Sequence, residues 1–229
     1  MLEPKYTNVL VTGSSNGIGL ATCKAFADKG YNVYGIDLVD SNFVSNNYHH
    51  YNVDIRDKEA LPDLPCIHIL VNNAGQQNSD DDLGHNLIGS MNVTSKYALN
   101  NPYIKSVIFN ASASAHTGFE FAEYSASKAG LIGYMKHCAW RLAKVDATCN
   151  SISCGGVLTD LNSAVIEDEA LWDQIMQVTP LNKWATAEEI AEWIYFLTVI
   201  NKSCSGQDIL IDNGEKDLNC TFVFPGFSY

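Results

Sequence analysis

The feature that most constrains the fold is a regular alternation of short apolar runs with longer amphipathic stretches. The apolar runs are rich in β-branched residues and read as buried strands, at residues 8–13, 31–37, 49–54, 67–75, 105–112, 147–155 and 206–214. Helical patterns lie at residues 17–30, 86–99, 121–144, 167–177 and 187–200. Strands that alternate with helices favour one parallel sheet, because each crossover helix covers a face of it. We therefore predict an α/β fold with a doubly wound parallel sheet.

Two connections are too short or too polar for a full covering helix. Residues 55–66 contain two prolines, and residues 76–85 are polar, so we expect irregular chain in both. No repeat, low-complexity run or Pro/Gly linker interrupts the pattern. We predict a single domain over residues 1–229, in which residues 216–229 form an aromatic tail. This tail packs either on its own subunit or on a neighbouring one.

Charge and composition exclude several classes of partner. The formal net charge of -12 argues against nucleic acid and against an anionic membrane surface, which both attract Lys and Arg. No window reaches the roughly 20 apolar residues of a membrane span. The seven cysteines form no C-x-x-C pair, and the first residues enter a strand without a charged-then-apolar leader. We expect a cytoplasmic protein with reduced thiols and no metal site.

The segment "TGSSNGIG", residues 12–19, lies where the first strand becomes the first helix. Gly13 suits a tight turn, Gly17 admits close approach of a pyrophosphate, and Gly19 allows close packing of helix on strand. Free N–H groups at the helix N-terminus attract phosphate. The spacing is G-x-x-x-G-x-G, and the alternative to a dinucleotide site is an ordinary glycine-rich turn.

An acidic residue, Asp37, ends the second strand 18 residues after Gly19. A carboxylate at about this distance accepts hydrogen bonds from the ribose hydroxyls and repels a 2′-phosphate. No Arg or Lys stands at 14–16 or 38–40 to bind such a phosphate. The sequence therefore favours NAD over NADP, with a solvated turn aspartate as the alternative interpretation.

Two further motifs follow in order, "NNAG" (72–75) and "YSASK" (124–128). With the glycine loop, they make the sequence from about residue 7 to 215 resemble the short-chain dehydrogenase/reductase family. The resemblance implies a Rossmann-type sheet, a nicotinamide cofactor and hydride transfer between an alcohol and a carbonyl. It also implies a homo-oligomer, a tetramer or a dimer, whose usual dimer surface corresponds to 86–99 and 121–144.

The resemblance assigns four catalytic residues. Tyr124 resembles the acid/base of the family, Lys128 its partner, and Ser112 the hydroxyl that orients the substrate. Ser112 precedes Tyr124 by one residue fewer than is usual, which suggests a trimmed loop, and Ser114 is the alternative serine. Asn86 resembles the helix asparagine that completes the tetrad through a bound water.

The cofactor residues that the resemblance implies gather around the glycine loop, the strand ends and the catalytic helix. Asp54 and Ile55 would meet the adenine ring, and Val157 and Thr159 the carboxamide. The full set is Gly13, Asn16, Gly17, Ile18, Asp37, Leu38, Asp54, Ile55, Asn73, Ala74, Gly75, Tyr124, Lys128, Val157 and Thr159. One departure from the family is Cys154, which stands where proline is usual.

The spacing of Tyr124 and Lys128 has a physical reason. A free tyrosine has a pKa near 10, too high for a base at neutral pH. Residues four apart share a helix face, so the ammonium group of Lys128 can favour the phenolate. Such a general acid–base group contributes roughly 10²–10⁴ in rate.

We therefore predict an NAD-dependent oxidoreductase that acts on a secondary alcohol or ketone. The alternative is a catalytically idle dinucleotide-binding sensor or scaffold. The substrate loops are expected at 113–121 and after Thr159, where an acidic stretch (160–174) suits neutral or cationic substrates. His116, four residues after Ser112, is a further candidate for a binding role.

Overall fold

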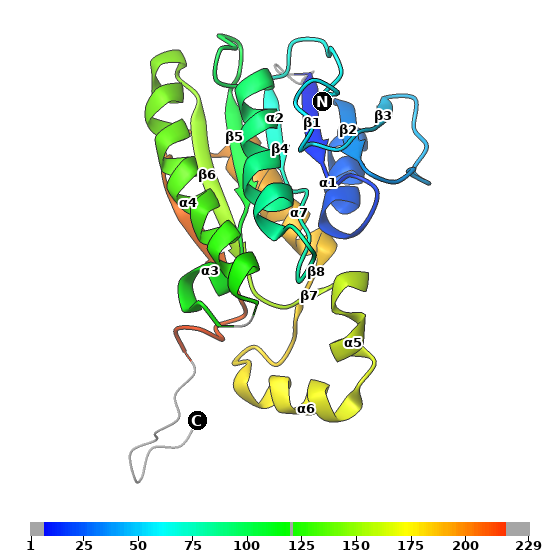
Figure 1. Cartoon of the computed structure of the whole chain (residues 1–229), viewed down its shortest axis with the longest axis vertical. Coiled ribbons are helices and arrows are strands. Elements are labelled where there is room, and N and C mark those ends of the chain that lie inside the picture. Colours follow the sequence, from blue (N-terminus) through cyan, green and yellow to red (C-terminus); the bar gives the residue numbers. More distant parts are fainter. Residues whose placement is uncertain (1–6, 120, 219–229) are drawn as a thin grey trace.

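The fold, described for residues 7–119 and 121–218 of a computed structural model, is built on a seven-stranded parallel sheet (Figure 1). The strand order is β3-β2-β1-β4-β5-β6-β9. The strands are β1 (Asn8–Thr12), β2 (Asn32–Asp37), β3 (Tyr48–Asn52), β4 (Ile69–Asn72), β5 (Ser106–Asn110), β6 (Thr148–Cys154) and β9 (Asp208–Ile211). The predicted doubly wound parallel sheet is confirmed, with strands shorter than the apolar runs that predicted them.

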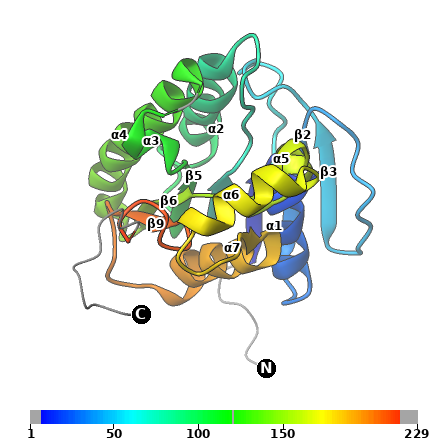
Figure 2. The same cartoon turned by 90° about the horizontal axis from the view of Figure 1, so that it is seen from below.

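Helices cover both faces of this sheet (Figure 2). One face carries α1 (Gly17–Ala27) and α7 (Ala187–Tyr195), and the other carries α2 (Gly89–Tyr97) and α4 (Ala122–Leu142). Strand β1 shows why the strands read as continuous apolar runs. Val9 and Val11 pack toward α1 and α7, whereas Leu10 packs toward α2 and α4, and all three are fully buried.

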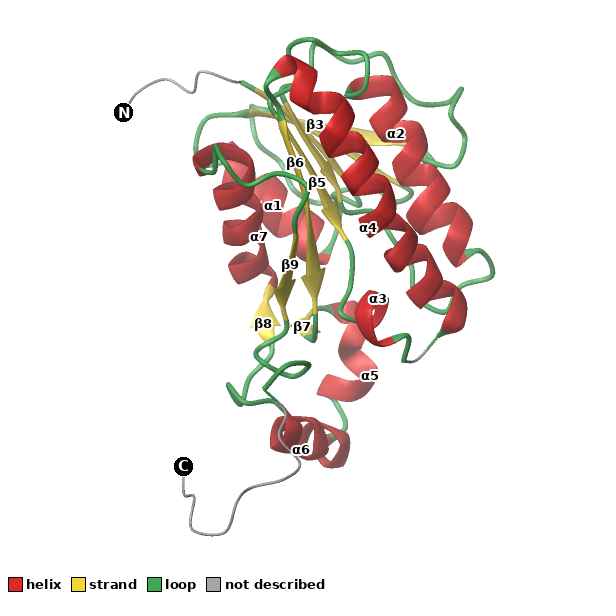
Figure 3. Cartoon of the chain, turned by 90° about the vertical axis from the view of Figure 1, so that its left-hand side faces the viewer, coloured by secondary structure: helices red, strands yellow, loops and turns green. Residues whose placement is uncertain are grey.

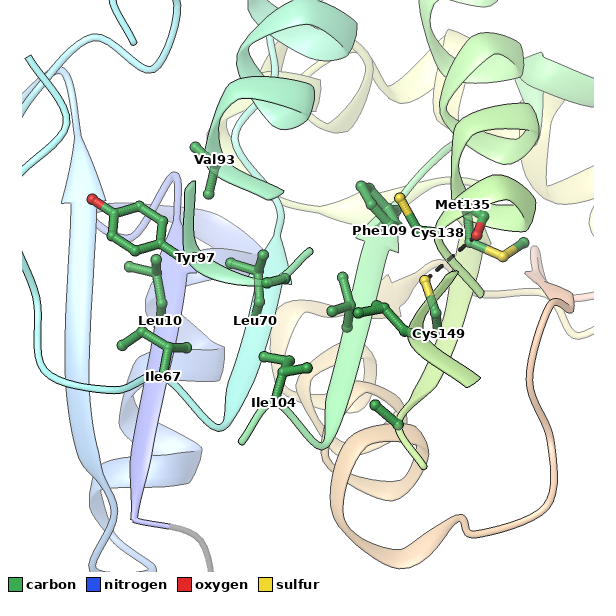
Figure 4. Packing of buried hydrophobic residues seen from close by; sticks show 14 of the residues in the cluster. Leu10, Ile67, Leu70, Val93, Tyr97, Ile104, Phe109, Met135, Cys138 and Cys149 are labelled. Carbon is green, nitrogen blue, oxygen red and sulfur yellow. Dashed lines mark hydrogen bonds between the residues drawn. The ribbon is translucent and has the colours of Figure 1, made fainter. Parts of the chain in front are cut away.

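The core under α2 and α4 is apolar and closely packed (Figure 4). Leu10 and Leu70 of the sheet lie in the same cluster as Val93 and Tyr97 of α2. Cys149 is also buried there, and its thiol donates to the carbonyl oxygen of Met135 at 3.5 Å. Burial raises the pKa of Cys149, so this thiol acts as a small apolar side chain. The six cysteines within the described ranges are unpaired.

Residues 53–68 contain neither helix nor strand between β3 and β4, as their composition predicts. The second prediction, irregular chain over 76–85, is confirmed only for its first part, because a helical turn begins at Leu83. The regular turns of α1 end at Ala27, three residues before the end of the helical pattern. Gly30 closes the helix as a C-capping glycine: its φ is 84°, its N–H donates to the carbonyl oxygen of Ala27 at 2.9 Å, and the N–H of Tyr31 donates to that of Phe26 at 3.2 Å.

Several elements appear that the sequence patterns did not predict. Two short strands, β7 (Val157–Leu158) and β8 (Ala185–Thr186), pair beyond the carboxyl end of the main sheet. The segment between them projects below this edge (Figure 3). It contains η3 (Asp160–Asn162), α5 (Ser163–Ile166) and α6 (Glu169–Val178), of which only α6 corresponds to a predicted helix, the one over 167–177. The short helix α3 (Ser114–Thr117) is also new, whereas η1 (Leu83–Ile88), η2 (Ala143–Val145) and η4 (Phe196–Ile200) overlap the helices predicted over 86–99, 121–144 and 187–200.

Most of the predicted aromatic tail, from residue 219 onward, lies outside the described residues. Among the helices that are described, none combines the length and the hydrophobicity that a transmembrane span requires.

Candidate active site

A cavity of about 280 Å³ lies at the carboxyl ends of β1, β2 and β4. Twelve of the fifteen residues assigned to cofactor binding line it. They are Gly13, Asn16, Gly17, Ile18, Asp37, Leu38, Asp54, Ile55, Asn73, Ala74, Gly75 and Thr159. Tyr124, Lys128 and Val157 are not among the lining residues. The sheet therefore gathers at one edge residues that are up to 146 positions apart, as Gly13 and Thr159 are.

The glycine loop fits the role that its spacing predicts. Gly13 and Gly17 have positive φ values of 67° and 49°. A Cβ on Gly19 would lie 1.8 Å from the carbonyl oxygen of Gly13, so no larger residue fits there. Asn16 precedes α1 and makes no side-chain cap, which leaves the first N–H groups of the helix available to a phosphate.

The turn after β4 is fastened to this loop. The side-chain nitrogen of Asn73, Nδ2, donates to the carbonyl oxygens of Thr12 and Gly13, at 3.1 and 3.2 Å. The Thr12 hydroxyl in turn accepts the N–H groups of Asn73 and Ala74, both at 3.1 Å. These bonds hold the "NNAG" segment against the end of β1, where both border the cavity.

Asp37 lies at the end of β2, on the wall of the cavity. Its carboxylate accepts the N–H groups of Ser15 at 2.9 Å and of Leu38 at 2.7 Å. These backbone donors fix the carboxylate against the glycine loop. A fixed acid beside a cradle of positive-φ glycines fits the ribose and pyrophosphate of a dinucleotide.

Sequence reasoning missed one arrangement that holds Asp54, a residue of the cavity wall. Arg56 donates to Asp54 from Nη2 at 2.7 Å and to Asp81 from Nη1 at 3.1 Å. These hydrogen bonds hold the pKa of Asp54 below its usual value, so this carboxyl stays ionised. The D-x-R spacing of Asp54 and Arg56 is the only local signal for the pair. Gln76 and His85 also line the cavity without having been predicted.

Lys128 lies on α4 with 4% of its surface exposed. Its ammonium donates to the carbonyl oxygen of Asn110, at the end of β5, over 2.8 Å. The ammonium nitrogen is 5.6 Å from the centre of the Tyr124 ring. A Cβ on Gly75 would lie 3.1 Å from it, so Lys128 is directly behind the cavity wall. Burial lowers the pKa of Lys128 to about 8.

Asn86 is completely buried in η1, a wide helical turn of the kind often found at functional sites. Its side chain exchanges two hydrogen bonds with the backbone of Gln76, at 2.8 and 2.9 Å. It also donates to the hydroxyl of Ser127 at 2.8 Å. Asn86 therefore joins the "NNAG" turn to α4, next to Lys128.

Ser112 follows β5 and is 7% exposed. The neighbouring N–H groups of Ala111 and Ala113 bond to β6, which fixes the backbone on both sides of it. The Ser112 hydroxyl oxygen accepts the N–H of Ser114 at 3.2 Å. Ser114 is the first residue of α3, so the two candidate serines lie on a strand end and on the helix that follows it.

Cys154 occupies a buried position at the end of β6. Its thiol donates to the side-chain oxygen of Asn110 at 3.5 Å. Burial raises the pKa of Cys154 to about 12, although the charge of Lys128 opposes this. The thiol is therefore protonated at neutral pH, and it fills space behind the Lys128 site.

Comparisons with known proteins agree with this geometry. A family model described as enoyl-(acyl carrier protein) reductase matches residues 13–216. The L-rhamnose 1-dehydrogenase (NADP(+)) of Thermoplasma acidophilum is 28% identical, over 93% of this chain and 98% of that protein. The acetoacetyl-CoA reductase of Paracoccus denitrificans is 30% identical, over 82% of this chain and 88% of that protein.

A solved structure has the same fold as this chain. The structure of 4-hydroxyisoleucine dehydrogenase complexed with NADH superposes with a TM-score of 0.83 at 26% identity. The match covers 92% of this chain and 98% of that one. The family model spans nearly all of the sheet and the cavity. The chain therefore belongs to the short-chain dehydrogenase/reductase family of oxidoreductases.

Proposed function

We propose that this protein is an NAD-dependent oxidoreductase that transfers hydride between the nicotinamide and a secondary alcohol or ketone. One observation carries the proposal. The buried ammonium of Lys128 lies 5.6 Å from the Tyr124 ring and directly behind Gly75, which lines the dinucleotide cavity. A buried ammonium beside a phenol at the wall of a cleft is typical of a catalytic site.

Different residues of the cavity would bind different parts of the dinucleotide. The glycine loop and the N-terminus of α1 would hold the pyrophosphate, and Asp37 the adenosine ribose. Asp54 and Ile55 would meet the adenine, while Val157 and Thr159 would contact the carboxamide. When bound, the nicotinamide supplies the donor or acceptor of hydride.

Side chains of the protein transfer the proton of the alcohol. Tyr124 takes the alcohol proton during oxidation and returns it during reduction, while the positive charge of Lys128 stabilises the phenolate. Ser112 donates a hydrogen bond to the reacting oxygen and fixes its direction, with Ser114 as the alternative. Asn86 holds the Gln76 backbone that borders the cavity.

The preference for NAD rests on Asp37. Its carboxylate lies on the cavity wall, and no Lys or Arg is among the lining residues. We expect wild-type protein to bind NADH at least 10-fold more tightly than NADPH, since a 2′-phosphate would face this carboxylate. Asp37→Ser should reduce that ratio, measured as two dissociation constants by fluorescence titration. An unchanged ratio would assign the choice of cofactor to other residues.

Tyr124→Phe tests the activity. On a panel of sugars, polyols, diols and keto acids, wild type should turn over at least one substrate with NAD or NADH. The variant should lose roughly 10²–10⁴ in kcat. It should bind NADH as wild type does, because the phenol is not needed to form the cavity. If wild type and variant bind NADH equally and neither turns over any substrate, the idle sensor or scaffold replaces the enzyme as our interpretation.

The proposed assembly and location rest on the family and the sequence. We propose a homotetramer or homodimer in the cytoplasm that takes small molecules and binds neither nucleic acid nor membrane. Size-exclusion chromatography with light scattering measures the oligomeric state.

A further inference from the structure

A buried polar cluster lies beside the proposed substrate site. At its centre is the carboxylate of Asp208, the first residue of β9, with 9% of the side chain exposed. It accepts the hydroxyls of Ser151 at 2.5 Å and Ser153 at 2.9 Å, both from β6. It also accepts a hydrogen bond from Nε2 of His116, a residue of α3, at 2.7 Å. Three segments distant in sequence therefore meet at one carboxylate.

The cluster does not have the geometry of a nucleophilic triad. The same nitrogen of His116, Nε2, faces both Asp208 at 2.7 Å and Ser153 at 3.2 Å. A triad needs the hydroxyl and the carboxylate on opposite ring nitrogens, so that a proton crosses the ring. Ser153 is moreover completely buried. The cluster is therefore not a nucleophilic triad.

We propose that His116 is a positioning residue of the active site. Through its bond to Asp208 it fixes α3, and through α3 it fixes the direction of the Ser112 hydroxyl. The inference rests on the proposed function, because it concerns the orientation of the substrate oxygen by Ser112.

Helix α3 needs such an anchor. It has four residues, a single turn, and so short a helix is marginal without tertiary contacts. It also ends at Gly118, which has a positive φ of 64° and open space around it. An imidazole nitrogen that faces a carboxylate must carry the proton, because an ionised carboxylate only accepts. His116 therefore donates from the exposed helix into the buried edge of the sheet.

The connection from α3 to Ser112 is direct. The N–H of Ser114, at the start of α3, donates to the Ser112 oxygen at 3.2 Å. This bond occupies one lone pair of the hydroxyl and leaves its hydrogen for a substrate oxygen. A tilt of α3 would move the Ser114 N–H and would turn the Ser112 hydroxyl away. Orientation errors of about 1 Å cost up to roughly 100-fold in rate.

The test compares three variants of the full chain. His116→Leu removes the donor, His116→Gln keeps a side-chain N–H of similar reach, and Ser151→Ala removes a partner that Asp208 does not share with His116. We expect His116→Leu to lower kcat by roughly 10-fold, with the NADH dissociation constant within twofold of wild type. Glutamine should restore most of the loss. Ser151→Ala should lower the melting temperature and leave kcat near wild type.

A second measurement does not depend on turnover. Amide hydrogen exchange of Ala115 and Gly118, in the NADH complex, should be at least 10-fold faster in His116→Leu and unchanged in Ser151→Ala. Equal exchange in wild type and His116→Leu would overturn the inference, and so would equal loss of kcat in His116→Leu and Ser151→Ala. If wild type shows no turnover at all, the proposed function fails, and the exchange data still decide whether His116 anchors α3.

Discussion

The two sides of the cleft are built by different means. The cofactor side, around β1, α1 and β4, depends on backbone conformation and on the absence of side chains. Gly13 and Gly17 have positive φ, and Gly19 leaves no room for a Cβ. The substrate side, around α3, β6 and β9, depends on hydrogen bonds between side chains such as His116 and Asp208.

This difference determines how each side can change. A backbone cradle accepts almost no substitution, because its shape is the binding site. A network of side chains can be rearranged in pieces, provided that each buried polar group keeps a partner.

The largest effect is expected on the cofactor side. In Gly19→Ala the new methyl would lie 1.8 Å from the Gly13 carbonyl oxygen, so the loop must move. We expect NADH affinity to fall more than about 100-fold and the free energy of unfolding to fall by about 3 kcal/mol, as for severe overpacking. Calorimetric titration and chemical denaturation measure the two. Gly133→Ala is the matched control, because Gly133 is an exposed residue of α4 with open space where the new Cβ would lie. This variant should bind NADH as wild type does.

If Gly19→Ala bound NADH like wild type, the backbone of the loop would not define the site, and the contrast between the two sides would fail.

The next effect concerns Lys128, where the two sides meet. Burial lowers the pKa of Lys128 from 10.5 to about 8, so the charged form at pH 7 costs about 3 kcal/mol of stability. Lys128→Met removes this cost and loses one hydrogen bond, worth about 1 kcal/mol, to Asn110. We expect the variant to be more stable by about 2 kcal/mol at pH 7 and to lack turnover. Urea denaturation and a turnover assay test both statements.

The sign of the pH effect follows from the direction of the shift. Between pH 8 and 10.5 the unfolded state holds the proton more tightly, so wild type gains stability relative to the variant as the pH rises. The advantage of Lys128→Met should therefore shrink over that interval. Lys136→Met, at an exposed position of the same helix, serves as control and should change stability by less than about 0.5 kcal/mol. A variant less stable than wild type at pH 7 would mean that the ammonium supports the fold.

The sequence predicted what short local patterns encode. Six strands of the main sheet followed from short apolar runs, β3 followed from the more polar run at 49–54, and the glycine loop followed from the residue type that its φ values require. The spacing from the glycine loop assigned Asp37 and the resemblance assigned the "NNAG" turn, and both lie on the same cavity. These features could be found because each is defined within a few neighbouring residues.

The missed features depend on partners that are distant in the sequence. Arg56 reaches Asp81 across 25 positions, and His116 reaches Asp208 across 92 positions. No local pattern marks either contact. The one-turn helix α3 was missed for the same reason, because a helix of this length forms only where tertiary contacts support it. Pairing of β7 with β8 likewise requires the chain to return after α6.

We expect the smallest effect from a substitution on the substrate side that keeps the hydrogen bonds of the side chain it replaces. Glu215 accepts hydrogen bonds from the Thr179 hydroxyl at 2.8 Å and from the Trp184 indole at 3.1 Å. Thr179 follows α6 and Trp184 packs on Gly156, so this carboxyl holds both ends of the return from the projecting segment. Burial raises the pKa of Glu215 above its usual 4.5.

Above pH 4.5 the folded state therefore binds the Glu215 proton more tightly than the unfolded state, and stability falls as the pH rises through the raised pKa. Glu215→Gln keeps an acceptor oxygen for both donors and removes the charge. We expect a flatter dependence of the melting temperature on pH and a small gain at pH 7, measured by scanning calorimetry. Glu167→Gln, on the exposed surface, should leave the wild-type slope. If Glu215→Gln instead destabilised the protein as much as Glu215→Ala, the substrate side would be as intolerant of exchange as the glycine loop.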